Sequence, residues 1–252
     1  MKTDCSPKNH RLALVLPRIA FRAGRKELTL GTAPLVVGTL SSLFTRLSAR
    51  KLQGACDLVE VRLDHTPRPQ DWQQRCAGIE KIGWPVILTV RHAGEGGSWD
   101  GTEEARLSAL KWGVEHLAGV DVELRSRLAT PVARLAKKSD KVCIVSFHDF
   151  DQTPSLKKLQ TIATQAGQLG SIVKISTRIE EAKDVETLHS LLSNRHKRPL
   201  CVIGMGEDWQ ETRISFALHG SCLTYGYLDS PAAPGQIPAK ELKRRLARRR
   251  IR

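Results

Sequence analysis

The sequence predicts a single-domain α/β protein, a (β/α)8 TIM barrel, on the basis of three observations. Short apolar runs rich in β-branched residues recur eight times between residues 34 and 239. Helix-like stretches separate these runs, and strands that alternate with helices pair in parallel through right-handed crossovers. The chain has 252 residues, and a barrel of this type takes about 250.

Each expected strand is one of the apolar runs. The strands are expected at 34–40, 57–64, 85–91, 119–125, 141–148, 171–177, 199–205 and 221–227. Eight such units are the number that closes a barrel. The alternative is an open, doubly wound sheet, which usually carries a glycine-rich loop after its first strand. The sequence GTLSSLFTR at that position offers no such loop.

Two of the stretches between strands carry clear helix signals. The stretch 153–170 has Pro154 near its start and Gly170 at its end, as helices often do. The stretch 102–117 has acidic residues in its first turn and apolar residues three or four positions apart. Those apolar residues are Leu107, Leu110, Val114 and Leu117.

Three segments are expected along the chain. Residues 34–239 form the catalytic barrel, residues 1–33 an N-terminal extension, and residues 240–252 a basic C-terminal helix or tail. The extension is either a hairpin that caps the barrel or a disordered segment. The net charge of +14 divides into +5 on residues 1–33, +7 on 240–252 and only +2 on the barrel. Basic ends without interleaved aromatic residues do not favour nucleic-acid binding.

Neither membrane insertion nor secretion is expected. No apolar run approaches the ~20 residues that span a bilayer. The short apolar segment 12–21 is broken by Pro17 and Arg18, so it is not expected to be a secretory leader. Six scattered cysteines form no CxxC pair, which indicates reduced thiols of a cytoplasmic protein, not a zinc or redox site. Those expected to be buried in strands are Cys143, Cys201 and Cys222.

Polar side chains at the carboxyl ends of strands would meet at the mouth of such a barrel. Glu60, Arg62 and Asp64 have i, i+2, i+4 spacing and project from one face of their strand. A Glu60–Arg62 ion pair could equally be a structural layer, and a lone strand-end histidine is often structural. The convergence of ionisable groups from successive units favours an active site. The other polar residues expected at the mouth are Arg91, Glu95, Asp121, Glu123, His148, Lys174, Arg213 and Gln236.

Lys174 is the most informative of these residues, because it lies inside an apolar strand. A buried ammonium group usually responds to burial by a lowered pKa, and such an amine attacks carbonyl carbon to form an iminium. The iminium acidifies the neighbouring C–H, so His148 could remove that proton and return it to a departing hydroxyl. Glu95 is the candidate carboxylate that orients the imidazole. Lysine and histidine together therefore predict dehydration through an imine, and the arginines predict an anionic substrate.

From about residue 34 to 245 the chain resembles type I 3-dehydroquinate dehydratase, the imine-forming hydro-lyase of the shikimate pathway, which leads to chorismate and the aromatic amino acids. The resemblance depends on seven motifs in the expected order. They are EVRLD (60–64), TVRHAGEGG (89–97), DVEL (121–124), SFHDF (146–150), VKIS (173–176), MGEDWQETR (205–213) and APGQI (233–237).

The resemblance implies that 3-dehydroquinate becomes 3-dehydroshikimate and water. Lys174 would form the covalent imine, His148 would act as general base and acid, and Glu95 would orient His148. Arg213 would hold the substrate carboxylate, and no metal or dissociable cofactor would be needed. The resemblance also implies a homodimer. The further substrate-binding residues would be Glu60, Arg62, Arg91, Met205, Ser230 and Gln236.

The sequence departs from the family pattern at three positions. Ala232 stands where the family usually has a serine, and Ser230 is a candidate to replace that hydroxyl. In MGEDWQETR, Trp209 replaces a glycine and Thr212 a serine. These differences bear on substrate affinity more than on the type of reaction.

Three other functions are alternatives for this sequence. Another imine-forming enzyme such as an aldolase would usually carry phosphate-binding loops after strands seven and eight, and SPAAPGQIP lacks them. A metal-dependent lyase would use the acids as oxygen ligands, but arginines are interleaved with those acids. A non-catalytic scaffold or nucleic-acid binder would use the basic ends instead. Deletion of residues 246–252 separates the two roles, because an enzyme should keep its turnover without them.

Overall fold

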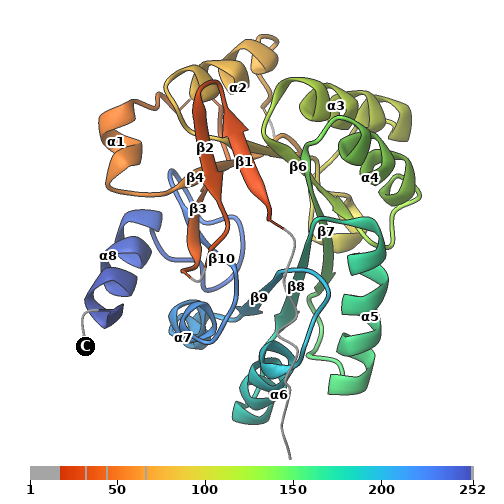
Figure 1. The fold of residues 1–252 in the computed structure, drawn as a ribbon, viewed down its shortest axis with the longest axis vertical. Coiled ribbons are helices and arrows are strands. Elements are labelled where there is room, and N and C mark those ends of the chain that lie inside the picture. Colours follow the sequence, from red (N-terminus) through yellow and green to blue (C-terminus); the bar gives the residue numbers. More distant parts are fainter. Residues whose placement is uncertain (1–17, 32, 44, 66, 251–252) are drawn as a thin grey trace, which may run out of the picture.

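The computed structural model describes residues 18–31, 33–43, 45–65 and 67–250, with eight parallel strands in one curved sheet (Figure 1). Their order is β10-β3-β4-β5-β6-β7-β8-β9. The predicted barrel is confirmed, and the strand bounds agree with the prediction to within two residues. The strands are β3 Leu35–Leu40, β4 Leu58–Arg62, β5 Val86–Thr89, β6 Gly119–Glu123, β7 Val142–Asp149, β8 Ile172–Arg178, β9 Leu200–Met205 and β10 Leu223–Tyr227.

The barrel is nearly closed between β9 and β10. These strands lie side by side without a continuous ladder, and a single backbone bond joins Cys222 N to Leu200 O at 2.9 Å. The Cys201 thiol also crosses the seam, to Leu223 O at 3.4 Å, as does the Ser221 hydroxyl. The hydroxyl accepts from Val202 N at 3.0 Å and donates to Leu223 O at 2.8 Å. Side-chain contacts of Cys201 and Ser221 thus supplement the one backbone bond between β9 and β10.

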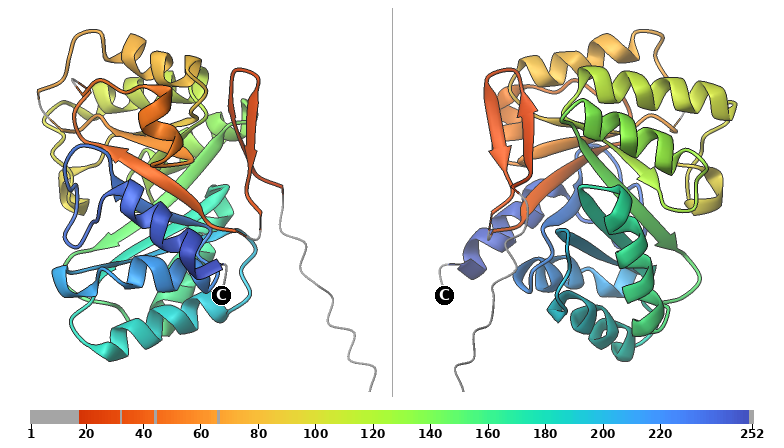
Figure 2. Two further views of the ribbon diagram at one scale, coloured as in Figure 1. Left: turned by 90° about the vertical axis from the view of Figure 1, so that its left-hand side faces the viewer. Right: turned by 45° about the vertical axis from the view of Figure 1, so that its right-hand side comes forward.

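Helices cover the outside of the strands (Figures 1 and 2). They are α1 Ala49–Gln53, α2 Trp72–Lys81, α3 Glu103–His116, α4 Ala129–Lys138, α5 Leu156–Leu169, α6 Ala182–Ser193, α7 Thr212–Leu218 and α8 Ala239–Arg250, with short 3-10 helices η1 Ala93–Glu95 and η2 Glu207–Trp209. In the described part of the chain, no helix combines the length and apolar character needed to span a bilayer.

The structure adds detail to the two helix predictions. The helix α5 begins at Leu156 and has Gly170 as its C-cap, so Pro154 lies near its start, two residues before the first helical residue. Ser155 has ψ of 149°, and this extended conformation keeps the helix from starting earlier. In α3 the fully buried face includes Arg106, whereas Leu107 is only half-buried. The arginine is buried because its guanidinium has acceptors inside the fold, as described below.

Side chains alternate between two environments along the strands, as the period of two requires. Outward residues such as Val59 and Val120 pack under the helices. Inward residues near the strand starts form a separate apolar cluster inside the barrel, which we call the floor. The floor includes Val37, Leu58, Ile87, Val142, Ile144, Ile172 and Leu223. Above it most inward residues are polar, with Ile203 and Met205 as apolar exceptions, so the site has an apolar base beneath a charged mouth.

A β-hairpin lies against the floor, away from the strand arrowheads (Figure 2). It consists of β1 Ala20–Ala23 and β2 Lys26–Thr29, paired antiparallel. Ile19 and Phe21 belong to the floor cluster, and Phe21 is fully buried. A hairpin is one of the two forms expected of residues 1–33, and residues 1–17 lie outside the described part.

The basic helix α8 packs on β3 and β10 and completes the ring of helices. Leu242 and Leu246 are buried in the outer core. Arg245 and Arg249 form ion pairs with Glu211, just before α7. The segment predicted as a C-terminal helix or tail is therefore a packed helix through residue 250.

Candidate active site

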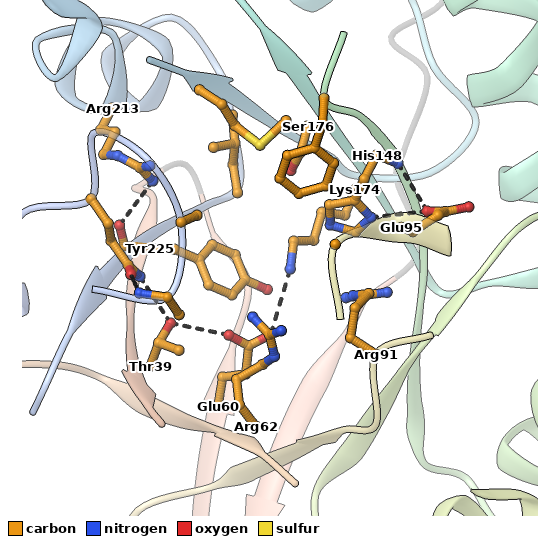
Figure 3. A pocket seen from close by; sticks show the side chains of 17 residues that line it. Thr39, Glu60, Arg62, Arg91, Glu95, His148, Lys174, Ser176, Arg213 and Tyr225 are labelled. Carbon is orange, nitrogen blue, oxygen red and sulfur yellow. Dashed lines mark hydrogen bonds and ion pairs between the residues drawn. The ribbon is translucent and has the colours of Figure 1, made fainter. Parts of the chain in front are cut away.

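A cavity of about 500 Å³, including its open mouth, lies at the carboxyl end of the strands (Figure 3). All the residues predicted to be catalytic or to bind substrate line it except Ser230, which is exposed on the loop after β10. Three other acids expected at the mouth, Asp64, Asp121 and Glu123, are buried and do not line the cavity. The lining residues predicted from sequence are Glu60, Arg62, Arg91, Glu95, His148, Lys174, Met205, Arg213 and Gln236. Further lining residues that were not predicted are Thr39, Gly96, Phe150, Ser176, Ile203, Tyr225, Ala232 and Ala233.

Lys174 extends from the middle of β8 into the cavity and is only 5% exposed. Its amine nitrogen lies 3.2 Å from Asp121 Oδ2 and 3.5 Å from Glu60 Oε1. The same nitrogen lies 4.1 Å from the centroid of the Tyr225 ring. The neighbours of Lys174 in the sequence are apolar, but the neighbours of its amine are two carboxylates and an aromatic ring. Val173 points outward to the helices, and the inward neighbours of the amine come from other strands.

His148 is held at the end of β7 by a carboxylate from the loop after β5. Glu95 Oε2 lies 3.0 Å from His148 Nδ1 and also accepts from the His148 backbone N–H at 3.0 Å. Because Glu95 accepts, Nδ1 is assigned the proton and Nε2 keeps its lone pair. Burial and the nearby cations Arg91 and Lys174 hold the pKa of His148 well below its usual range. The imidazole is thus a neutral base at neutral pH.

Glu95 is itself an unusual carboxyl group. Burial raises its pKa to about 7, against the opposing effect of Arg91. Its second oxygen, Oε1, is buried without a hydrogen-bond partner among the described residues. Gly96, with φ of 74°, ends the short helix η1 that carries Glu95. A Cβ at Gly96 would lie 2.2 Å from the Phe150 ring, so only glycine fits there.

Arg91 belongs to an ion-pair network beneath the mouth. Its guanidinium donates to Asp121 Oδ1 and to Ser146 Oγ, both at 2.8 Å, and lies 3.1 Å from Glu123 Oε1. Glu123 is also paired with the fully buried Arg106 from α3. The Arg91 guanidinium therefore holds the carboxylates of Asp121 and Glu123 in place. Arg106 escaped the sequence analysis because it lies on a helix, outside the strand-end pattern.

Glu60 and Arg62 do not pair with each other, so the structural Glu60–Arg62 ion pair considered above is wrong. Arg62 reaches past the strand end to Asp64, with two bonds of 2.9 and 2.8 Å. Glu60 accepts from the hydroxyls of Thr39 at 3.0 Å and Thr89 at 2.9 Å. Its carboxylate is thereby aimed at the Lys174 amine.

Arg213 has a buried guanidinium that donates its hydrogen bonds to backbone carbonyls. It donates to Gly235 O at 2.8 Å, Pro234 O at 3.2 Å and Tyr225 O at 3.3 Å. Burial lowers its pKa to about 10. A buried cation without a carboxylate partner is a ready binding site for an anion.

The loop after β10 closes one side of the cavity. Gln236 Oε1 accepts from Ala232 N at 2.7 Å, and Gln236 Nε2 donates to Thr39 Oγ1 at 3.2 Å. Ala232 lines the cavity without a hydroxyl, and Ser230 lies outside the lining. In this conformation Ser230 therefore does not replace the hydroxyl that the family carries at position 232.

The other departures lie beside the cavity, not in it. Trp209 is partly buried against the outer core and does not line the cavity. Its ring lies next to Gly206, where a Cβ would be 2.8 Å from Trp209 Cδ1. Thr212 Oγ1 donates to Trp209 O at 2.6 Å, so the threonine uses the hydroxyl that a serine would also provide.

The carboxylates proposed above as alternative metal ligands all have cationic partners. Asp64 is paired with Arg62, Asp121 with Arg91 and Lys174, and Glu123 with Arg91 and Arg106. Among the described residues, no group of three or more His, Cys, Asp or Glu side chains has the geometry to hold a metal ion. The acids instead balance a set of buried cations.

Comparisons with known proteins agree with this geometry. The family model described as Type I 3-dehydroquinase matches residues 32–251. A 3-dehydroquinate dehydratase of Methanocella arvoryzae is 34% identical over 209 residues, or 83% of this chain and 94% of the relative. One from Methanocaldococcus jannaschii is 35% identical over 201 residues, or 78% and 89%.

Solved structures lead to the same family. The crystal structure of 3-dehydroquinate dehydratase from Geobacillus kaustophilus HTA426 superposes with a TM-score of 0.77 at 25% identity. The superposition covers 92% of this chain and 96% of that chain. As the motifs predicted, the chain belongs to the type I 3-dehydroquinase family.

Proposed function

We propose that this protein is a 3-dehydroquinate dehydratase of the shikimate pathway that works through a Schiff base on Lys174. The observation that carries the proposal is a buried primary amine that shares one cavity with a neutral imidazole. Amine and imidazole together are the two groups that an imine-mediated elimination requires. No metal and no dissociable cofactor enters this chemistry.

The first step joins the Lys174 nitrogen to the substrate ketone carbon. An ammonium group and a ketone give an iminium and one water, so both protons of that water come from the amine. Glu60, 3.5 Å from the nitrogen, is placed to carry protons between the amine and the departing oxygen. The positive iminium then draws electrons from the adjacent C–H bond, which becomes acidic.

His148 performs the second step. Its Nε2 takes the proton from the carbon beside the iminium, and the electron pair expels the β-hydroxyl. The imidazolium returns its proton to that hydroxyl, which leaves as water. Glu95 holds the ring through Nδ1 during both transfers, at 3.0 Å. Hydrolysis of the imine then releases the conjugated enone product and restores the lysine.

Arg213 is proposed to hold the substrate carboxylate. The guanidinium is buried, and its bonds to carbonyls 234 and 235 are neutral contacts that a carboxylate can replace with a stronger, charge-assisted pair. Arg62 and Gln236 line the same cavity and are proposed as contacts of the substrate hydroxyls.

Borohydride trapping tests the proposal. With 3-dehydroquinate and borohydride, we expect one covalent adduct on the peptide that contains Lys174, detected by mass spectrometry. Lys174→Met should form no adduct and lose turnover, measured by the ultraviolet absorbance of the enone. His148→Ala should still form the adduct while turnover falls by about 100-fold or more, the usual effect of a general acid–base.

The exposed lysine Lys157 provides a matched control. Lys157→Met should keep both the adduct and the turnover of the wild type. Wild-type turnover in both Lys174→Met and His148→Ala would refute the Schiff-base assignment.

Three further expectations remain predictions. Activity that survives EDTA is expected of a metal-free reaction. The homodimer implied by the family resemblance can be measured by light scattering of the full chain, and cytoplasmic location by fractionation of the source cells.

A further inference from the structure

Tyr225 lies at the centre of the cavity and has no role so far. It is the third residue of β10, beside Val37 of β3, and is only 3% exposed. Its ring faces the Lys174 amine, 4.1 Å from the ring centroid, and its backbone carbonyl accepts from Arg213. The residue thus lies between the amine proposed to attack the ketone and the guanidinium proposed to hold the carboxylate.

The phenol hydroxyl of Tyr225 is buried without a hydrogen-bond partner in the described part of the chain. Figure 3 shows it pointing into the space that the Lys174 amine also enters. A buried hydroxyl normally has a partner, because losing its bonds to water is costly. A hydroxyl that lines a binding cavity without one is available to a group that arrives with the substrate.

We infer that the Tyr225 hydroxyl donates a hydrogen bond to the ketone oxygen of the substrate while Lys174 adds to the ketone carbon. This inference rests on the proposed function. In the addition, the C–N bond forms as the C=O π pair moves onto oxygen, which accumulates negative charge. A fixed donor aimed at that oxygen stabilises the charge without reorganisation.

Tyr225 acts in this step as a donor and keeps its proton. Burial and the nearby carboxylate of Glu60 raise the pKa of the phenol well above its usual value, so the hydroxyl stays neutral. The two protons that the departing oxygen needs still come from the amine. The overall step remains ammonium plus ketone to iminium plus water.

Tyr225→Phe tests the inference because it removes only the hydroxyl oxygen. We expect borohydride-trapped adduct on Lys174 to accumulate about 10-fold or more slowly in rapid-quench time courses, since one preorganised donor to an oxyanion contributes about 100-fold in comparable sites. The final amount of adduct should match the wild type, and kcat/KM should fall in proportion. Tyr227→Phe, two residues along the same strand and outside the cavity lining, is the matched control and should behave as wild type.

Three other outcomes would contradict either the role of the Tyr225 hydroxyl or the proposed function. Adduct formation at the wild-type rate in Tyr225→Phe overturns this inference and leaves the Schiff-base function intact. A large fall in the thermal midpoint of Tyr225→Phe would mean that the hydroxyl serves stability, which also overturns it. Absence of any Lys174 adduct in the wild type overturns the proposed function instead.

Discussion

Glu95 and Asp121 are buried carboxyl groups near the reacting side chains, and their surroundings shift their pKa values in opposite directions. Burial raises the pKa of Glu95 to about 7, and the nearby Glu123 adds to this rise, whereas the cations Arg91 and Arg125 oppose it. Burial also acts on Asp121, but the Arg91 and Lys174 cations outweigh it and hold that pKa well below its usual range. At neutral pH Asp121 is therefore ionised, whereas the pH is close to the pKa of Glu95.

The raised pKa of Glu95 predicts a pH-dependent cost to stability. Between the unfolded pKa near 4.5 and the folded pKa of about 7, the folded state keeps a proton that the unfolded chain loses, so stability falls as pH rises. Glu95→Gln removes this loss. Between pH 5 and pH 8 the free energy of unfolding of the wild type should fall by about 2–3 kcal/mol relative to Glu95→Gln.

Urea unfolding at the two pH values measures this difference. Glu186→Gln, at an exposed position of α6, should titrate like the wild type. If Glu95→Gln showed the same pH dependence as the wild type, Glu95 would be an ordinary ionised carboxylate at pH 7.

At the scale of elements, two loops meet over the cavity. Gly235, in the loop after β10, has φ of 69°, and a Cβ on it would lie 2.1 Å from Gly206 O in the loop after β9. The Gly235 carbonyl also accepts from Arg213, so the loop contact and the proposed carboxylate site share one residue. The position of the β10–α8 loop is thereby coupled to the guanidinium.

Gly235→Ala should consequently damage substrate binding more than chemistry. The added methyl group would clash with backbone atoms of Gly206, which cannot rotate away as a side chain could, so the two loops are forced apart. Small displacements of binding groups have large effects, so KM should rise about 10-fold while kcat changes by less than about threefold. Steady-state kinetics on the enone absorbance would measure both constants.

Gly24→Ala is a matched control, since Gly24 has φ of 58° in the distant hairpin and an added Cβ meets nothing within 4 Å. It should leave KM and kcat unchanged. A KM for Gly235→Ala equal to that of Gly24→Ala would mean that the loop contact has no influence on the site.

At the scale of the whole molecule, stability and chemistry occupy opposite ends of the barrel. The inward side chains near the strand starts are apolar and are covered by the hairpin, whereas most of those near the strand ends are ionised or hydroxylated, with Ile203 and Met205 of β9 as apolar exceptions. This division is general in such barrels, because the loops after the strands can vary without disturbing the base.

Phe21→Ala should therefore weaken the fold and spare the reaction. The ring is fully buried in the floor, and loss of a buried phenylalanine costs about 3–5 kcal/mol. At a temperature where the variant is folded, kcat/KM should stay within about twofold of the wild type. Chemical denaturation and the enone assay provide the two readouts.

Leu28→Ala, on the other strand of the hairpin and only partly buried, should destabilise the protein less. A large fall in kcat/KM for Phe21→Ala in its folded state would show that floor and mouth are coupled.

Much of the site followed from the strand pattern. Once the eight strands were assigned, a period of two predicted that Glu60, Arg62, His148 and Lys174 point into one cavity, and all four line it. Tyr225 follows the same period on β10. It was not predicted as a site residue because its hydroxyl is neutral and the prediction depended on charged side chains. Arg106 could not be found this way, since its guanidinium reaches the site from a helix.

The sequence by itself determined the barrel, the order of its strands and the set of residues that face its mouth, because these depend on hydrophobic periodicity along the chain. Only the tertiary structure decided the pairing: Arg62 with Asp64, Arg106 with Glu123, and the Lys174 amine with two acids and an aromatic ring. Pairing depends on distances between side chains of different elements. Those distances are set by packing across the barrel, which no local pattern encodes.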